Sequence, residues 1–161
     1  MKRDSRLSVA LHVLVHMHDM RDAISSETLG AMMGQNPAVL RRTMGGLRDA
    51  GIVHSDKGHG GGWKLARPLS EVTLGEVYAA LGTPALFSIG HREESPGCLV
   101  EQAVNRALGR ALDEAEALLL ARLRSVTIAD IAAEVLQHEG FRLGHHGPGH
   151  KPHKKGTKHH A

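Results

Sequence analysis

Two adjacent arginines in the first third of the chain could bind nucleic acid. Arg41 and Arg42 lie in a segment whose apolar residues recur at the spacing of one buried helical face. That face consists of Leu40, Thr43, Met44 and Leu47. The arginines and Ala38 fall on the opposite face, where a guanidinium group can bind guanine O6 and N7 or a phosphate. The pair predicts a recognition helix for duplex DNA, and a merely solvated helix face is the alternative.

A glycine-rich segment with the sequence KGHGGG follows the arginines and could approach DNA closely. It lies between Ile52–Ser55 and Trp63–Ala66, two short segments with the pattern of strands. A nucleotide-binding phosphate loop needs a helix directly after it, whereas a strand follows here. We therefore expect a β-hairpin whose tip contacts phosphates or the minor groove through Lys57, His59 and Gly60. A purely structural hairpin is the alternative.

Three helices are expected before this hairpin. Residues 5–20 carry apolar side chains at helical spacing. Residues 25–34 begin with two serines that can cap a helix and end with a glycine that can close one. Residues 36–51 open with Asn-Pro, a capping residue followed by proline at the first helical position, and again close with glycine. A helix-turn-helix followed by a hairpin is a winged helix, and its commonest use is binding duplex DNA.

A long helix is predicted over residues 99–124. Its apolar residues repeat at alternating spacings of four and three, as in a coiled coil. They are Val104, Leu108, Ala111, Ala115 and Leu118. At about 1.5 Å per residue the helix would be nearly 40 Å long, too long to be stable in water without a partner. We refer to these five residues as the seam and expect them to contact a second copy of the chain.

Two capping-box patterns, Thr73-x-x-Glu76 and Thr127-x-x-Asp130, mark the starts of two further helices. The predicted fold is mainly α-helical with a small β-hairpin wing, and it divides into four parts. They are a winged helix-turn-helix DNA-binding domain over residues 1–82, a linker loop over 83–98, dimerisation helices over 99–140, and a His/Lys-rich tail over 141–161 that is expected to be disordered.

The charge of the chain is divided along its length. Residues 1–70 hold ten Lys and Arg against six Asp and Glu, residues 71–140 hold five against eleven, and the last 21 hold five and none. A basic first half suits a module that faces phosphates. A single cysteine excludes an intrachain disulfide framework and fits a reducing cytoplasm. No segment approaches the ~20 apolar residues of a membrane span, and we expect no signal peptide.

Cys98 directly precedes the long helix. A thiol at a helix N-terminus experiences a partial positive charge, which favours the thiolate and redox reactivity. A lone cysteine is as often a small buried apolar residue without a chemical role. The sequence leaves both possibilities open.

Histidines are the remaining residues that could do chemistry. Six of the thirteen lie near the C-terminus, at His145, His146, His150, His153, His159 and His160. Such a segment can bind Ni²⁺, Zn²⁺ or Cu²⁺ loosely, which makes a metal-responsive or metal-binding protein the alternative function. We expect His12, His16 and His18, on the first helix, to be surface or packing residues rather than ligands. No grouping of nucleophile, base and orienting residue predicts an enzyme.

Four segments taken together resemble the Rrf2 family of bacterial regulators. They are Ser5–Leu14, Asn36–Arg42, Gly51–Leu65 and Leu74–Val77. The resemblance extends over about residues 1–135 and implies a homodimeric winged-helix protein that binds partly palindromic promoter DNA, usually as a repressor. By position it implies DNA contacts from a set of six residues. They are Ala38, Val39, Arg41, Arg42, Lys57 and His59.

Members of that family that hold an iron–sulfur cluster carry three cysteines before the long helix. Only Cys98 stands there in this chain, in the position of the last of the three. A cluster normally needs four ligands, so we expect no iron–sulfur cluster and no other cofactor. The chain looks instead like a single-cysteine branch of the family, and oxidation of Cys98 is the candidate signal.

Overall fold

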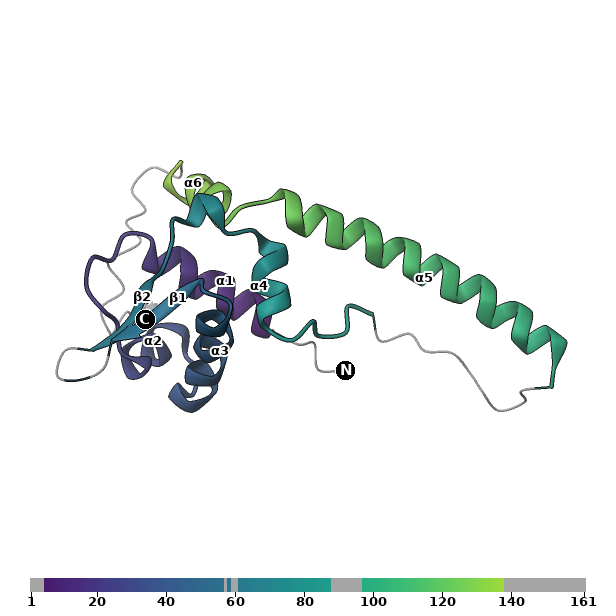
Figure 1. Cartoon of the computed structure of the whole chain (residues 1–161), viewed down its shortest axis with the longest axis horizontal. Coiled ribbons are helices and arrows are strands. Elements are labelled where there is room, and N and C mark those ends of the chain that lie inside the picture. Colours follow the sequence, from purple (N-terminus) through teal and green to yellow (C-terminus); the bar gives the residue numbers. More distant parts are fainter. Residues whose placement is uncertain (1–4, 57, 59–60, 88–96, 138–161) are drawn as a thin grey trace, which may run out of the picture.

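The computed structural model describes residues 5–56, 58, 61–87 and 97–137. Its elements are α1 (Arg6–Met17), α2 (Ser26–Met33), α3 (Pro37–Asp49), β1 (Val53–Asp56), β2 (Gly62–Leu65), η1 (Leu69–Glu71), α4 (Leu74–Ala80), α5 (Leu99–Ser125) and α6 (Ile128–Leu136). Figure 1 shows one body formed by the first elements and α6, from which α5 projects as a long arm. The predicted class, mainly α-helical with a two-stranded wing, is confirmed.

Helix α1 lies at the centre of the body. It packs against α2, α3, α4, β2 and α6 and contributes Ala10, Val13 and Leu14, which are fully buried. Leu40, Met44 and Leu47 of α3 enter the same core, as the apolar spacing of that helix predicts. The recognition helix is therefore held on its inner side by apolar packing, and its outer side is left for other contacts.

Local capping fixes the helix-turn-helix. The Ser25 side chain accepts a hydrogen bond from the Thr28 amide at 3.0 Å, and Gly34 ends α2 in the left-handed conformation with φ of 60°. The Asn36 side chain accepts a hydrogen bond from the Ala38 amide at 2.8 Å, and Pro37 occupies the first position of α3. These caps confirm the predicted helix starts, because each depends on neighbours in the sequence.

The wing is a two-stranded antiparallel sheet in which Val53 pairs with Leu65 and Asp56 with Gly62. The sequence predicts strands at Ile52–Ser55 and Trp63–Ala66. The first strand lies one residue later than predicted, and the second one residue earlier. Ile52 is instead fully buried below the sheet and donates its amide to the Leu47 carbonyl at 2.9 Å, which closes the end of α3.

Helix α3 contains two adjacent glycines, Gly45 and Gly46, and close packing against α4 explains the second of them. A Cβ on Gly46 would lie 2.5 Å from the Ala80 carbonyl oxygen, whereas one on Gly45 would meet nothing within 4 Å. The close approach of α4 therefore requires glycine at position 46. No neighbouring atom requires glycine at position 45.

Helices α5 and α6 differ in how they meet the body. The Leu74 amide donates to the Val126 carbonyl at 3.0 Å and the Ile128 amide to the Val72 carbonyl at 2.9 Å, which joins the α5–α6 connection to the start of α4. Ile128 and Ala132 then enter the core beside α1. No residue of α5 is buried, although it has 27 residues. That residues 99–140 form dimerisation helices stays a prediction. In the protomer, α6 contributes to the core of the body.

The capping box of α4 is combined with an ion pair. Glu76 accepts a hydrogen bond from the Thr73 amide at 2.8 Å and one from the Arg67 guanidinium at 2.6 Å. The bond from Arg67, followed by the one from the Thr73 amide, lowers the pKa of Glu76 below its ordinary value of 4.5. A carboxylate with a lowered folded pKa stabilises the fold above its unfolded pKa, and this contribution is lost as the pH falls through the folded value.

We expect Glu76→Gln to lower the free energy of unfolding at pH 7 by about 1 kcal/mol or less, because the side chain is partly exposed. The difference from wild type should begin to shrink below a pH of about 4.5, where the carboxylate of the unfolded chain becomes protonated, and should vanish at lower pH, where the folded carboxylate is protonated as well. Urea unfolding at pH 7 and pH 3.5 measures both values, with Glu71→Gln at a nearby exposed carboxylate as the control. A difference that is equal at the two pH values would contradict the role given to the ionised group.

Candidate nucleic-acid interface

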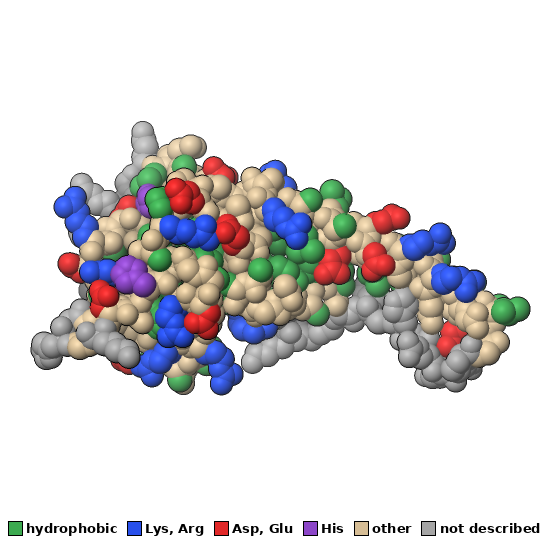
Figure 2. Space-filling model, viewed as in Figure 1, with side chains coloured by type: hydrophobic (Ala, Val, Ile, Leu, Met, Phe, Trp, Pro, Cys, Tyr) green, Lys and Arg blue, Asp and Glu red, His purple; other side chains and the backbone are tan. Residues whose placement is uncertain are grey.

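The outer face of α3 is exposed along the residues expected to contact DNA. Ala38, Arg41 and Arg42 are exposed, and Val39 keeps 52% of its surface accessible although it is apolar. In Figure 2, Lys and Arg side chains gather at the lower edge of the body, over α3. The face therefore combines cationic groups with a methyl-bearing side chain, which can contact phosphates, guanine and the thymine methyl group.

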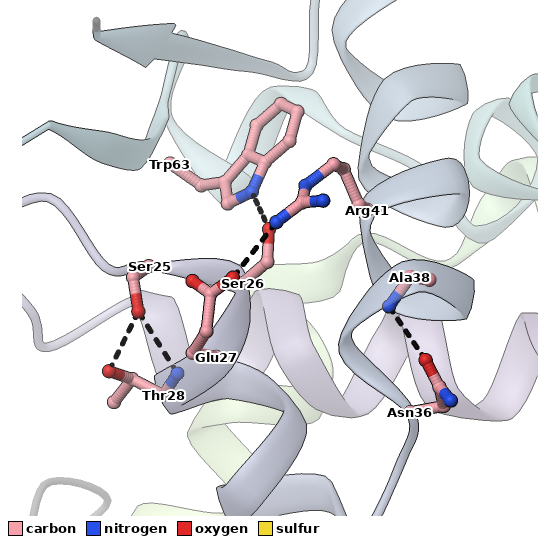
Figure 3. Close-up of polar contacts among 8 residues, drawn as sticks. All are labelled: Ser25, Ser26, Glu27, Thr28, Asn36, Ala38, Arg41 and Trp63. Carbon is pink, nitrogen blue, oxygen red and sulfur yellow. Dashed lines mark hydrogen bonds and ion pairs between the residues drawn. The ribbon is translucent and has the colours of Figure 1, made fainter. Parts of the chain in front are cut away.

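The two arginines differ in their surroundings. Arg41 forms an ion pair with Glu27 of α2, with 2.9 Å between Nη2 and Oε1 (Figure 3). Both side chains are mostly exposed, so the pair contributes little to stability and can be exchanged for a DNA contact. Arg42 has no ion pair with any residue that the structure describes. Glu27 therefore orients one guanidinium group, while the other stays available to a phosphate or a base.

A hollow of about 490 Å³ lies beside Arg42, between the first turn of α1, one flank of α3 and the end of α4. It is lined by Arg6, Ala38, Val39, Arg42, Thr43, Gly46, Ala80, Leu81 and Gly82. Arg6 thus lies on the same side of the body as Arg42. No pattern in the sequence indicates Arg6, because it precedes α3 by more than thirty residues and only the packing of α1 on α3 brings it near.

The base of the wing is fastened to the residues before α2. The amides and carbonyls of Ile24 and Trp63 exchange hydrogen bonds at 3.1 and 2.8 Å, so Ile24 extends the sheet by one residue. The Trp63 indole donates to the buried Ser26 hydroxyl at 2.9 Å (Figure 3). These contacts set where the wing begins. Lys57, His59 and Gly60, the predicted contacts at its tip, lie outside the described residues.

We expect Gly62→Ala to displace the wing, because a Cβ there would lie 2.6 Å from the carbonyl carbon and oxygen of Ile24. The free energy of unfolding should fall by about 1–3 kcal/mol, as for other overpacking substitutions. DNA affinity should fall by roughly tenfold, the equivalent of about 1.4 kcal/mol. Trp63, the only tryptophan, reports the change by fluorescence. Gly97→Ala, where an added Cβ meets nothing within 4 Å, is the control, and equal stability of the two variants would contradict the expectation.

Four of the five seam residues of α5 are exposed in the protomer. Val104 and Leu118 are 57% and 74% exposed, Ala111 and Ala115 are also exposed, and Leu108 is half-buried. The partly covered residues of α5 include Leu112, Leu120 and Leu123, which lie on another side of the helix. An apolar stripe is thus left without cover by the part of the protomer that the structure describes.

Cys98 occupies the N-cap position of α5, and its side chain is exposed. It makes no capping hydrogen bond. The sequence left open whether Cys98 is a reactive thiol or a small buried residue, and in the protomer Cys98 is not buried. Among the histidines, His16 is buried and His12 and His18 are exposed, while the six near the C-terminus lie outside the described residues.

Comparison with known proteins supplies the family. A sequence model of the Rrf2 family, described as iron-dependent transcriptional regulators, matches residues 3–134. The chain belongs to the Rrf2 family. It is 29% identical over 128 residues to YwnA of Bacillus subtilis, an inferred HTH-type transcriptional regulator, and the match covers 80% of this chain and 95% of that protein.

Solved structures share the fold of this Rrf2 protein. An inferred transcriptional regulator from Lactobacillus plantarum superposes with a TM-score of 0.72 at 22% identity, covering 86% of this chain and 93% of the other. The oxidized form of CymR from Staphylococcus aureus gives a TM-score of 0.60 at 19% identity, covering 82% and 96%. The predicted family is confirmed, and the protein is a DNA-binding transcriptional regulator rather than an enzyme. None of the described helices is both long and apolar enough to cross a membrane.

The iron of the Rrf2 family description does not fit the residues described here. A cluster normally needs four ligands, with cysteine as the main donor. Within residues 5–56, 58, 61–87 and 97–137, no three or more His, Cys, Asp or Glu side chains come together as metal ligands. Cys98 is the only cysteine of the chain. We therefore assign no iron–sulfur site, and the regulation proposed below does not involve one.

Proposed function

We propose that this Rrf2 protein is a homodimeric repressor that binds a partly palindromic operator through α3 and the wing. The observation that carries the proposal is the exposed cationic face of α3, with Arg42 unpaired among the described residues and Arg41 in an exchangeable surface pair. A basic helix face next to a wing presents cations to the major groove and to the flanking phosphates together. As a regulator of promoter DNA, it would act in the cytoplasm.

Each side chain of this face has a distinct role in the proposal. Arg41 and Arg42 bind guanine edges or phosphates, and Ala38 and Val39 pack against thymine methyl groups. Arg6 adds a phosphate contact at the side of α3, where it shares the hollow with Arg42. In the wing, we assign phosphate or minor-groove contacts to the predicted tip residues. They are Lys57, His59 and Gly60.

The second copy of the chain is proposed to bind along α5. The seam is apolar, exposed and spaced at alternating intervals of four and three residues, which is the pattern of helices that pair. Exposed apolar residues in such a row are uncommon on a monomer. Pairing of two α5 helices would place two copies of α3 on one duplex, each at its own half-site.

Cys98 is proposed as the switch. A peroxide would oxidise it: the thiolate attacks one oxygen, the O–O bond breaks, water leaves after protonation, and the sulfur becomes a sulfenic acid. Its exposure at the first residue of α5 supports this role, because a peroxide can reach the sulfur. Cys98 also connects the linker to the dimerisation helix, so a change there can alter how the two DNA-binding domains are spaced.

Fluorescence anisotropy on DNA from upstream of the protein's own gene tests the proposal, with an unrelated duplex as the reference. We expect specific binding of the reduced protein and at least a tenfold loss after peroxide treatment. Cys98→Ser should bind like the reduced wild type and stay unchanged by peroxide. Equal peroxide sensitivity in that variant would refute the switch. Absence of specific binding to any promoter fragment in a genome-wide selection would refute the regulator itself.

A further inference from the structure

His12 and His16 lie one helical turn apart on α1, and their imidazole rings face each other. The two Nε2 atoms are 3.0 Å apart. The ring centres are 4.8 Å apart, and the ring planes are inclined by 32°. His16 is only 3% exposed, whereas His12 is exposed, so the pair reaches from the core to the surface of α1.

The two Nε2 atoms are within hydrogen-bond distance of each other, and a metal ion bound between them would replace that hydrogen bond. An ion bound at about 2.0–2.1 Å to two nitrogens 3.0 Å apart would have an N–metal–N angle of roughly 95°. That angle fits neighbouring ligands of an octahedral or square-planar ion, such as Ni²⁺ or Cu²⁺, better than the tetrahedral angle of zinc.

We propose that His12 and His16 form a two-nitrogen chelate for a divalent transition metal of the Ni²⁺ or Cu²⁺ type. Neutral imidazole is the common protein ligand for such ions, and a single helical turn holds both nitrogens in place. In the described ranges no third His, Cys, Asp or Glu side chain joins the pair, so water would fill the remaining coordination positions.

Metal-dependent thermal unfolding distinguishes an ordered site on α1 from loose binding by the C-terminal histidines. The reference protein is the full chain with six C-terminal histidines replaced by glutamine, so that His12 and His16 are tested alone. The replaced residues are His145, His146, His150, His153, His159 and His160. An ion that binds the folded pair and not the unfolded chain raises the melting temperature, and at 100-fold excess over Kd we expect a rise of roughly 5 °C.

His12→Gln in this reference protein should abolish the rise produced by Ni²⁺, because it removes one nitrogen of the chelate. The rise is measured against the metal-free melting temperature of the same variant, so that loss of the hydrogen bond to His16 does not enter the comparison. His18→Gln, at an exposed histidine beside the pair, should keep the full rise. A reference protein that shows no rise, or an equal rise in His12→Gln, would overturn the proposal. DNA binding measured without metal should be unchanged in both variants, so the outcome is independent of the proposed repressor function.

Discussion

We expect replacement of Arg41 and Arg42 together with alanine to lower the affinity for operator DNA by about 100-fold. Each specific arginine contact is worth about 1–3 kcal/mol, and two contacts of about 1.4 kcal/mol each correspond to a factor of about 100. Both side chains are exposed and Arg41 contributes only a surface ion pair, so the melting temperature should be nearly unchanged. Anisotropy titrations at several salt concentrations provide the measurement.

Arg106→Ala combined with Arg110→Ala is the matched control. It removes the same two positive charges from the exposed surface of α5, far along the chain from α3. The control should bind operator DNA within about threefold of wild type, because a general loss of charge acts weakly at a distance through salt. If the two double variants lose affinity equally, the effect is one of net charge and the assigned recognition face is wrong.

We expect Leu118→Glu to disrupt the proposed dimer and, with it, the binding of two half-sites. Leu118 is 74% exposed in the protomer, so the folding of the single chain should tolerate the change. In a paired α5 the same position would be buried, and an unpaired carboxylate in such a place costs several kcal/mol. We expect the dimer dissociation constant to rise at least 100-fold, measured by sedimentation velocity over a range of concentrations.

Ala117→Glu introduces the same charge one residue away, at an exposed position on another side of α5. Since successive helical residues differ by about 100° in direction, this charge should face solvent in the dimer and leave the dissociation constant unchanged. Operator affinity should fall with Leu118→Glu and not with Ala117→Glu. A Leu118→Glu protein that sediments as a stable dimer would show that another surface joins the two copies.

Local features of this chain were predictable because their causes lie within a few residues. The starts of α2, α3, α4 and α6 depend on side chains that accept bonds from backbone amides two or three positions later. The inner and outer faces of α3 follow from helical periodicity, so the exposure of Arg41 and Arg42 agrees with the sequence pattern. The strand limits were off by one residue, because the Ile52 amide closes the end of α3 on the Leu47 carbonyl instead of pairing with the other strand.

Contacts between distant segments had no local signal that names both partners; the Gly45-Gly46 pair, for example, indicates a close approach but not the segment that approaches. The clamp of Ile24 on Trp63, the approach of Ala80 to Gly46 and the position of Arg6 beside α3 all join residues far apart in the sequence. The facing rings of His12 and His16 are an intermediate case, because their spacing of four places them on one helical face, while only the side-chain conformations bring the nitrogens to 3.0 Å.

The sequence by itself therefore determined the family, the order of the helices and the polarity of the recognition face, since capping and periodicity act over short separations. Only the tertiary structure decided which side chains share the interface and where the wing is attached. Those relations depend on how α1 packs against its neighbours, and close packing of separate segments is encoded by many weak contacts rather than by any one motif.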